Sequence, residues 1–259
     1  MKPETIEVYL QNIATCEKCS LSFIGKQKRE KDYYYYGPNE FQQKYAILLQ
    51  NPGESSQSHQ EVNLSKMLQN PAAKFKKDAE NLKDWFSANQ GFFINFFDEF
   101  SKYCAKDKYY SETSNGKVEF QIETIFKNLH IFDLVKCKTE TSNITKKALE
   151  ECSFYLEDEI NFLEKLELIF VVGSRAWSCF YKRFNCKILE ENMYLNELVP
   201  VSKIHGKLLV CSWGKRTFYA IPLQHMAKQI YNNTLRNSYF DYLREGLGQF
   251  QRERLIMLG

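Results

Sequence analysis

Four of the eight cysteines have a spacing that suits a metal centre. Cys16 and Cys19 form a CxxC pair, Cys137 follows an apolar run, and Cys152 lies 15 residues further along. Four thiolates can ligate either a [4Fe–4S] cluster or Zn²⁺, and one close pair with two distant cysteines suits a cluster better than the paired knuckles of a zinc ribbon. The alternative is a set of buried free thiols, which is also the simplest interpretation of the other four cysteines.

Three turns carry polar residues that suit hydrogen-bonding and acid–base chemistry. They are residues 50–54 (QNPGE), 133–137 (DLVKC) and 173–175 (GSR). Each lies at the end of a short, continuously hydrophobic run, which is the pattern of a strand buried on both faces. Parallel strands end at one edge of their sheet, and ligands of open α/β sheets bind at that edge. We therefore expect the three turns to line one site.

The elements that must position these turns alternate between strand and helix patterns. This alternation predicts an α/β fold with a central, parallel-type, four-stranded sheet flanked by helices. The strand candidates are residues 45–50, 129–135, 168–172, 208–211 and 218–222, and the helix candidates are residues 3–15, 63–69, 145–166, about 174–183 and two more at the end of the chain. We expect residues 1–259 to form one domain.

An aromatic-rich insertion over about residues 75–125 interrupts this alternation. It contains the stretch WFSANQGFFINFFDEFSKY, for which we predict helices and a loop. Its aromatic side chains either stack on bases or a sugar ring or belong to the core.

Composition and hydropathy argue against a membrane protein or a secreted protein. Of the 259 residues 44% are hydrophobic and 26% are charged, as in ordinary soluble domains. No apolar run reaches the roughly 18 residues of a membrane span, and the segment MKPETIEVYL lacks a signal-peptide core. We therefore expect a cytoplasmic protein that does not contact membranes. The net charge of +3 neither indicates nor excludes a nucleic-acid partner.

Seven short motifs, taken in order, resemble the uracil-DNA glycosylase superfamily, and most closely its iron–sulfur branch, families four and five. They are CEKCSL, LLQNPGE, FDLVKC, ECSFYL, IFVVGSRA, KIHGK and IPLQHM. The resemblance implies a monomeric, bacterial DNA-binding enzyme. It also implies that Cys16, Cys19, Cys137 and Cys152 hold a structural [4Fe–4S] cluster that ties the amino-terminal segment to the sheet.

Members of that superfamily extrude a nucleotide from the duplex and hydrolyse its N-glycosidic bond. By resemblance, His225 would stabilise negative charge on O2 of the departing base, and Asn51 would orient the attacking water. Glu54 is a second candidate for positioning water. The rest of the first turn, Gln50, Pro52 and Gly53, would contact the substrate through an anion-friendly backbone.

Asp133 departs from the family pattern, which has Asn at this position. A protonated carboxylic acid can accept a hydrogen bond from N4 of cytosine and donate one to N3, and burial would favour that form by raising the pKa. The alternative is that Asp133 pairs with Lys136 or a backbone group. A second departure is the lack of an aromatic residue after the first turn, where His59 and Gln60 leave room for a base substituent.

Together these departures favour a monofunctional DNA glycosylase for a 5-substituted cytosine, such as the glucosylated hydroxymethylcytosine of phage DNA. Two other interpretations stay open. One is a uracil-DNA glycosylase of base excision repair, and the other is a non-catalytic iron–sulfur module that binds DNA.

Overall fold

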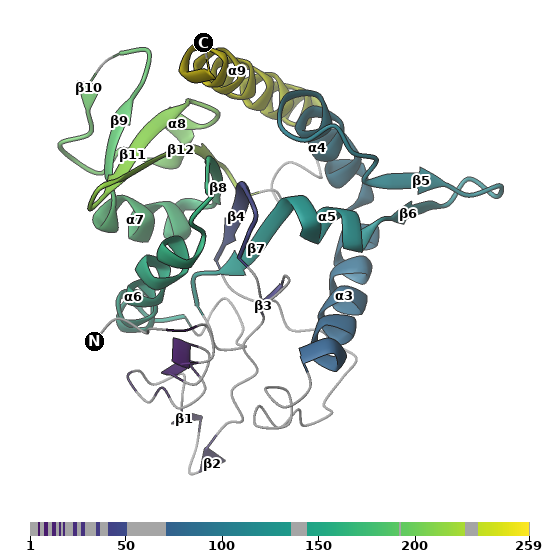
Figure 1. Ribbon diagram of the computed structural model, residues 1–259, viewed down its shortest axis with the longest axis horizontal. Helices are drawn as coiled ribbons and strands as arrows, with labels where there is room; N and C mark the ends of the chain where they lie inside the picture. The colour runs from purple at the N-terminus through teal and green to yellow at the C-terminus, as the bar shows by residue number, and fades with distance from the viewer. Residues whose placement is uncertain are drawn as a thin grey trace.

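A computed structural model of the chain describes residues 41–50, 71–135, 144–191, 193–225 and 233–258, together with short pieces between residues 5 and 36. Figure 1 shows a central sheet with helices on both sides. None of the helices in these ranges is both long and apolar enough to cross a membrane.

Eight strands form the central sheet, in the order β10-β9-β11-β12-β8-β4-β7-β3. Its middle four strands, β12, β8, β4 and β7, are parallel to one another. On either side the sheet continues through antiparallel strands, so the predicted four-stranded sheet was too small. The strands are β3 (Tyr35–Tyr36), β4 (Tyr45–Leu49), β7 (Leu129–Asp133), β8 (Leu168–Val172), β9 (Asn185–Ile188), β10 (Met193–Tyr194), β11 (Leu209–Trp213) and β12 (Arg216–Leu223). A separate two-stranded sheet pairs β1 (Phe23–Ile24) with β2 (Gln27–Lys28).

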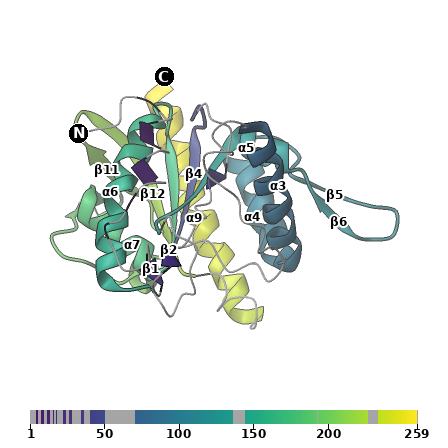
Figure 2. The same cartoon turned by 90° about the horizontal axis from the view of Figure 1, so that it is seen from below.

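Helices cover both faces of the sheet, as predicted for an α/β fold. One face carries α6 (Lys146–Phe162) and α7 (Ser174–Arg183), and the other carries α4 (Gln90–Tyr103) and α9 (Asn233–Leu258), as Figures 1 and 2 show. The short helix α8 (Val201–Ile204) precedes β11. After β12 the described residues form one 26-residue helix, α9, where the sequence predicted two helices.

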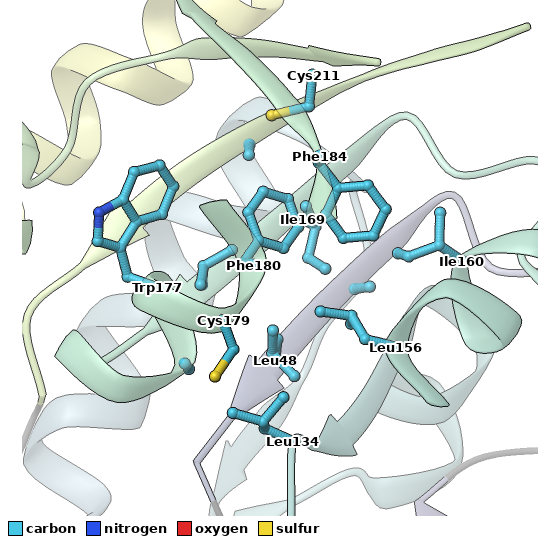
Figure 3. Close-up of a cluster of buried hydrophobic side chains, with 14 of the residues drawn as sticks. Leu48, Leu134, Leu156, Ile160, Ile169, Trp177, Cys179, Phe180, Phe184 and Cys211 are labelled. Atoms are coloured by element: carbon cyan, nitrogen blue, oxygen red, sulfur yellow. The ribbon is translucent and has the colours of Figure 1, made fainter. Parts of the chain in front are cut away.

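The central strands are continuously apolar because both of their faces are buried. Along β4, Ala46 and Leu48 belong to the core under α6 and α7, whereas Tyr45 and Ile47 belong to the core under α4 and α9. Figure 3 shows the first core, where side chains of the two helices meet those of the sheet, among them Leu156, Ile160, Trp177, Phe180, Leu48 and Ile169.

The insertion packs on the second face of the sheet and shares one core with α9. It comprises α3 (Pro71–Ala88), α4, a hairpin of β5 (Tyr110–Glu112) and β6 (Val118–Phe120), and α5 (Ile122–Asn128). The hairpin projects away from the sheet in both views (Figures 1 and 2). Five phenylalanines of α4 are buried: Phe92, Phe93, Phe96, Phe97 and Phe100. These rings therefore belong to the core, and base stacking by them is excluded.

Side chains satisfy the backbone at both ends of α6. The hydroxyl of Thr145 caps the start by accepting a hydrogen bond from the Ala148 N–H at 3.1 Å. At the other end the guanidinium of Arg216, the first residue of β12, donates to the carbonyl oxygens of Ile160 and Leu163. These contacts fix the position of the helix that carries Cys152.

Candidate active site

The carboxyl ends of the four parallel strands lie at one edge of the sheet. Asp133 ends β7, Gln50 follows β4, Gly173 follows β8, and His225 lies two residues beyond β12. Because β7, β4, β8 and β12 are consecutive neighbours, these positions form a row along that edge. The predicted common edge is thus confirmed for these strands.

Asp133 is held at this edge by continued pairing between β4 and β7. It lies in register with Leu49, and its side chain is buried, with 1% of the residue exposed. Beyond it the Leu134 N–H donates to the Leu49 carbonyl at 2.9 Å, and the Val135 N–H donates to the Gln50 carbonyl at 3.0 Å. Asp133 therefore brings a buried carboxyl group to the end of the sheet on a fixed backbone.

His225 lies at the other end of the row and is exposed. The Gly173 N–H donates to the Leu223 carbonyl at 2.8 Å, which joins the ends of β8 and β12. A Cβ atom built on Gly173 would lie 3.6 Å from Cδ2 of His225, so the imidazole packs over this glycine. Gly173 has a φ of +93°, which an L side chain rarely adopts. The turn thus leaves the imidazole accessible from the carboxyl edge.

Six predicted site residues lie outside the described residues. They are Asn51, Pro52, Gly53, Glu54, His59 and Gln60. Gln50, which directly precedes this segment, accepts a hydrogen bond from the Val135 N–H, two residues beyond Asp133. The roles of the six residues stay predictions.

Two of the four predicted metal ligands, Cys16 and Cys152, are described: Cys152 lies on α6, and Cys16 packs against the core under α6 and α7. Cys152 is buried beside Val135 and Ala148, and Val135 is two residues before Cys137. Cys16 is half-buried and packs against the core that contains Tyr155, one turn beyond Cys152.

Two further contacts hold the amino-terminal segment on α6. The Tyr155 hydroxyl donates to the Asn12 carbonyl at 3.2 Å, and Nζ of Lys18 lies 5.4 Å from the centroid of the Tyr155 ring. The segment that contains the CxxC motif therefore reaches the helix that carries Cys152. A thiolate donor set at this place fits an iron–sulfur cluster or zinc.

Cys19 and Cys137 lie outside the described residues. Within the part of the chain that is described, no group of three or more His, Cys, Asp or Glu side chains could hold a metal ion.

Sequence reasoning missed two residues behind His225. Nδ1 of His205 accepts a hydrogen bond from the Gln224 N–H at 3.3 Å, and the Tyr239 hydroxyl donates to the Gln224 carbonyl at 3.2 Å. The motif KIHGK contains His205, but no role was predicted for this histidine.

Comparison with known families agrees with this arrangement. The family model described as the uracil DNA glycosylase superfamily matches residues 36–248, more than four-fifths of the chain. The match includes Gln50, Asp133 and His225 and begins after Cys16 and Cys19. A search of curated proteins finds no match. The chain belongs to the uracil-DNA glycosylase superfamily.

Proposed function

We propose that the protein is a monofunctional DNA glycosylase that releases a 5-substituted cytosine and leaves an abasic site. Members of the superfamily are DNA glycosylases, so a DNA substrate is expected. The observation that carries the choice of base is a buried carboxyl group, Asp133, at the edge of the sheet that also presents His225. Phage DNA that carries glucosylated hydroxymethylcytosine is the proposed source of this base.

The proposed recognition uses the uncharged acid, which burial favours over the carboxylate. Its carbonyl oxygen would accept a hydrogen bond from the N4 amino group of cytosine, and its O–H would donate to N3. Uracil offers a donor at N3 and an acceptor at O4, which a carboxamide matches better. The N3 hydrogen bond would also draw negative charge from the departing cytosine, which is a poorer leaving group than uracil.

The proposed cleavage separates an electron-poor sugar from a base that gains negative charge. His225 would donate a hydrogen bond to O2 of the base from the opposite end of the row. The ends of β7 and β12 are three strand spacings apart, about 14 Å. This distance suits two side chains with one base between them. Asn51 would orient the attacking water with the help of Glu54, and His59 and Gln60 would leave space for the 5-substituent.

The substrate can be identified from the bases that are released. Duplexes that contain uracil, cytosine, hydroxymethylcytosine or glucosylated hydroxymethylcytosine are incubated with the protein, and free bases and alkali-labile sites are measured. We expect release of the substituted cytosine. Release of uracil alone would overturn the cytosine assignment and leave a repair glycosylase. DNA binding without release from any duplex would indicate the non-catalytic module.

Asp133→Asn tests the residue that reads the base. We expect the ratio of cytosine-type to uracil release to fall by about tenfold or more, because one bidentate pair is lost. The control is Glu159→Gln, the same chemical change at another buried carboxyl group, which lies on α6. An unchanged ratio in Asp133→Asn would show that this residue does not read the base.

We also propose that Cys16, Cys19, Cys137 and Cys152 hold a [4Fe–4S] cluster. Support comes from the contacts of Asn12 and Lys18 with Tyr155 of α6. Val135, two residues before Cys137, also shares a buried cluster with Cys152. When bound, the cluster would brace the amino-terminal segment and the loop after β7 against α6. Purified protein should contain stoichiometric iron and sulfide, and Cys16→Ser or Cys152→Ser should lose both, unlike Cys104→Ser at the residue that follows α4. Stoichiometric zinc without iron would contradict this proposal.

A further inference from the structure

Gln224, the residue before His225, is held at both of its backbone groups by side chains of other elements. Its N–H donates to Nδ1 of His205, which follows α8, and its carbonyl accepts from the hydroxyl of Tyr239 in α9. The regular pairing of β12 with β8 ends one residue earlier, at Leu223. The two side chains therefore replace the ladder partners that a strand loses where it ends.

The two rings that make these hydrogen bonds are buried and packed on each other. Their centroids are 4.4 Å apart, and only 8% of His205 and 1% of Tyr239 are exposed. Tyr242, one turn further along α9, contacts the imidazole with a centroid distance of 5.7 Å. Rings confined in this way lose little further freedom when they hold Gln224.

The backbone next to His205 is fixed by α9 and β12. The Gly206 N–H donates to the Pro222 carbonyl at 2.9 Å. A Cβ atom on Gly206 would lie 2.5 Å from the Tyr242 carbonyl oxygen, and one on Gly246 would overlap the Gly206 carbonyl oxygen. Only glycines allow this approach, so the turn after α8, the end of β12 and α9 form one rigid unit.

We infer that His205 and Tyr239 are positioning residues that set where the imidazole of His225 lies. His225 is exposed and follows directly after the doubly held Gln224, and its side chain packs over Gly173. A group that must meet one atom of an extruded base needs this kind of support, because small displacements cost large factors in rate. This inference rests on the proposed glycosylase activity, in which His225 contacts the base.

The test uses variants that remove one hydrogen bond to Gln224 but keep an aromatic ring in the same place. His205→Phe keeps a ring against Tyr239 but removes the acceptor, and Tyr239→Phe removes only the hydroxyl. His205→Asn keeps an acceptor close to the position of Nδ1. The matched control is Tyr242→Phe, which keeps the ring that contacts His205 and changes no group bonded to Gln224.

We expect His205→Phe and Tyr239→Phe to slow single-turnover base release by about 10- to 100-fold. The concentration of DNA at half-maximal rate should stay within about twofold, because remote contacts bind the duplex. His205→Asn should recover most of the rate, and Tyr242→Phe should match the wild type. A loss of rate in His205→Asn equal to that of His205→Phe would overturn the role of the Nδ1 acceptor.

A second measurement does not depend on activity. Amide hydrogen exchange at Gln224 should accelerate in His205→Phe, while exchange at Ile221 inside β12 stays slow. Faster exchange at both amides would overturn the inference in favour of general destabilisation. A wild type that releases no base would overturn the proposed function. An active wild type with fully active His205→Phe and Tyr239→Phe would overturn only the positioning role.

Discussion

At the scale of single residues, His205 shows how burial sets the charge of a group. Burial lowers the pKa of His205 to about 4, because a charged imidazole loses its solvation in the interior. Tyr239, which packs on the imidazole, has its own pKa raised by burial. His205 is therefore neutral near pH 7, and Nδ1 can accept the hydrogen bond from Gln224.

The lowered pKa predicts an acid-sensitive fold. In the unfolded chain a histidine titrates near pH 6.5, so between about pH 6.5 and 4 the unfolded state binds more protons. Stability should therefore fall as the pH drops through this window, by up to about 3 kcal/mol from this residue. Denaturant titrations at pH 7 and pH 4.5 measure the loss. His205→Asn should lose less stability than the wild type, and equal losses would contradict the assignment.

Asp133 and His225 show how much of the candidate site could be predicted from residue types and their order in the chain. The apolar runs before them predicted strand ends, and the turns that follow were expected at a common edge. Burial of Asp133 follows from its place at the end of a strand whose five residues are all buried. The pair behind His225 could not be predicted, because Tyr239 is 15 residues beyond Gln224 and meets it only through tertiary packing.

At the scale of elements, the long buried strands were predictable and the short peripheral ones were not. Each central strand is apolar on both faces, whereas β9 alternates exposed and buried residues and β10 has only two residues. In the hairpin, β5 has no fully buried residue and lies within a charged stretch. The continuous helix α9 was missed because Gly246 and Gly248 weaken a helix in isolation. In the fold, Gly246 is required for contact with Gly206.

The cap that Arg216 provides predicts a measurable loss of stability. Arg216→Met should destabilise the fold by about 1–3 kcal/mol, because it removes charged donors from the last carbonyls of α6. Thermal or denaturant unfolding measures the difference. Lys215→Met, at the preceding exposed position, is the control and should change little. Equal effects of the two variants would show that the cap contributes nothing.

Because the aromatic rings of α4 are buried, we expect them to contribute to the stability of the fold but not to the affinity for DNA. Phe96 is buried against Phe170 of β8, with ring centroids 5.2 Å apart. Phe96→Leu should lower the free energy of unfolding by about 1–2 kcal/mol and leave affinity for DNA unchanged. Denaturant unfolding and duplex binding measure the two quantities. A selective loss of DNA binding would contradict the placement of this ring in the core.

At the scale of the whole molecule, basic and acidic residues nearly balance. DNA binding must therefore depend on a local basic surface and not on the net charge. The 35 basic and 32 acidic residues give a net charge of only +3. We expect the logarithm of the DNA affinity to fall linearly with the logarithm of salt concentration, with a slope of about −0.9 for each phosphate contact. Titrations of a labelled duplex at several salt concentrations measure this slope. A slope near zero would indicate that few phosphates are contacted.

The path of α9 has a consequence for how this molecule can be altered. The helix holds Gln224 through Tyr239 near its start, and near its end Arg254 donates to the Tyr45 hydroxyl and pairs with Glu167 at the opposite edge of the sheet. A single continuous helix thus contacts both the carboxyl and the amino edge of the central sheet. Trimming the last turns of α9 would remove Arg254 and its contacts with Tyr45 and Glu167, at the far end of the same helix that holds Gln224.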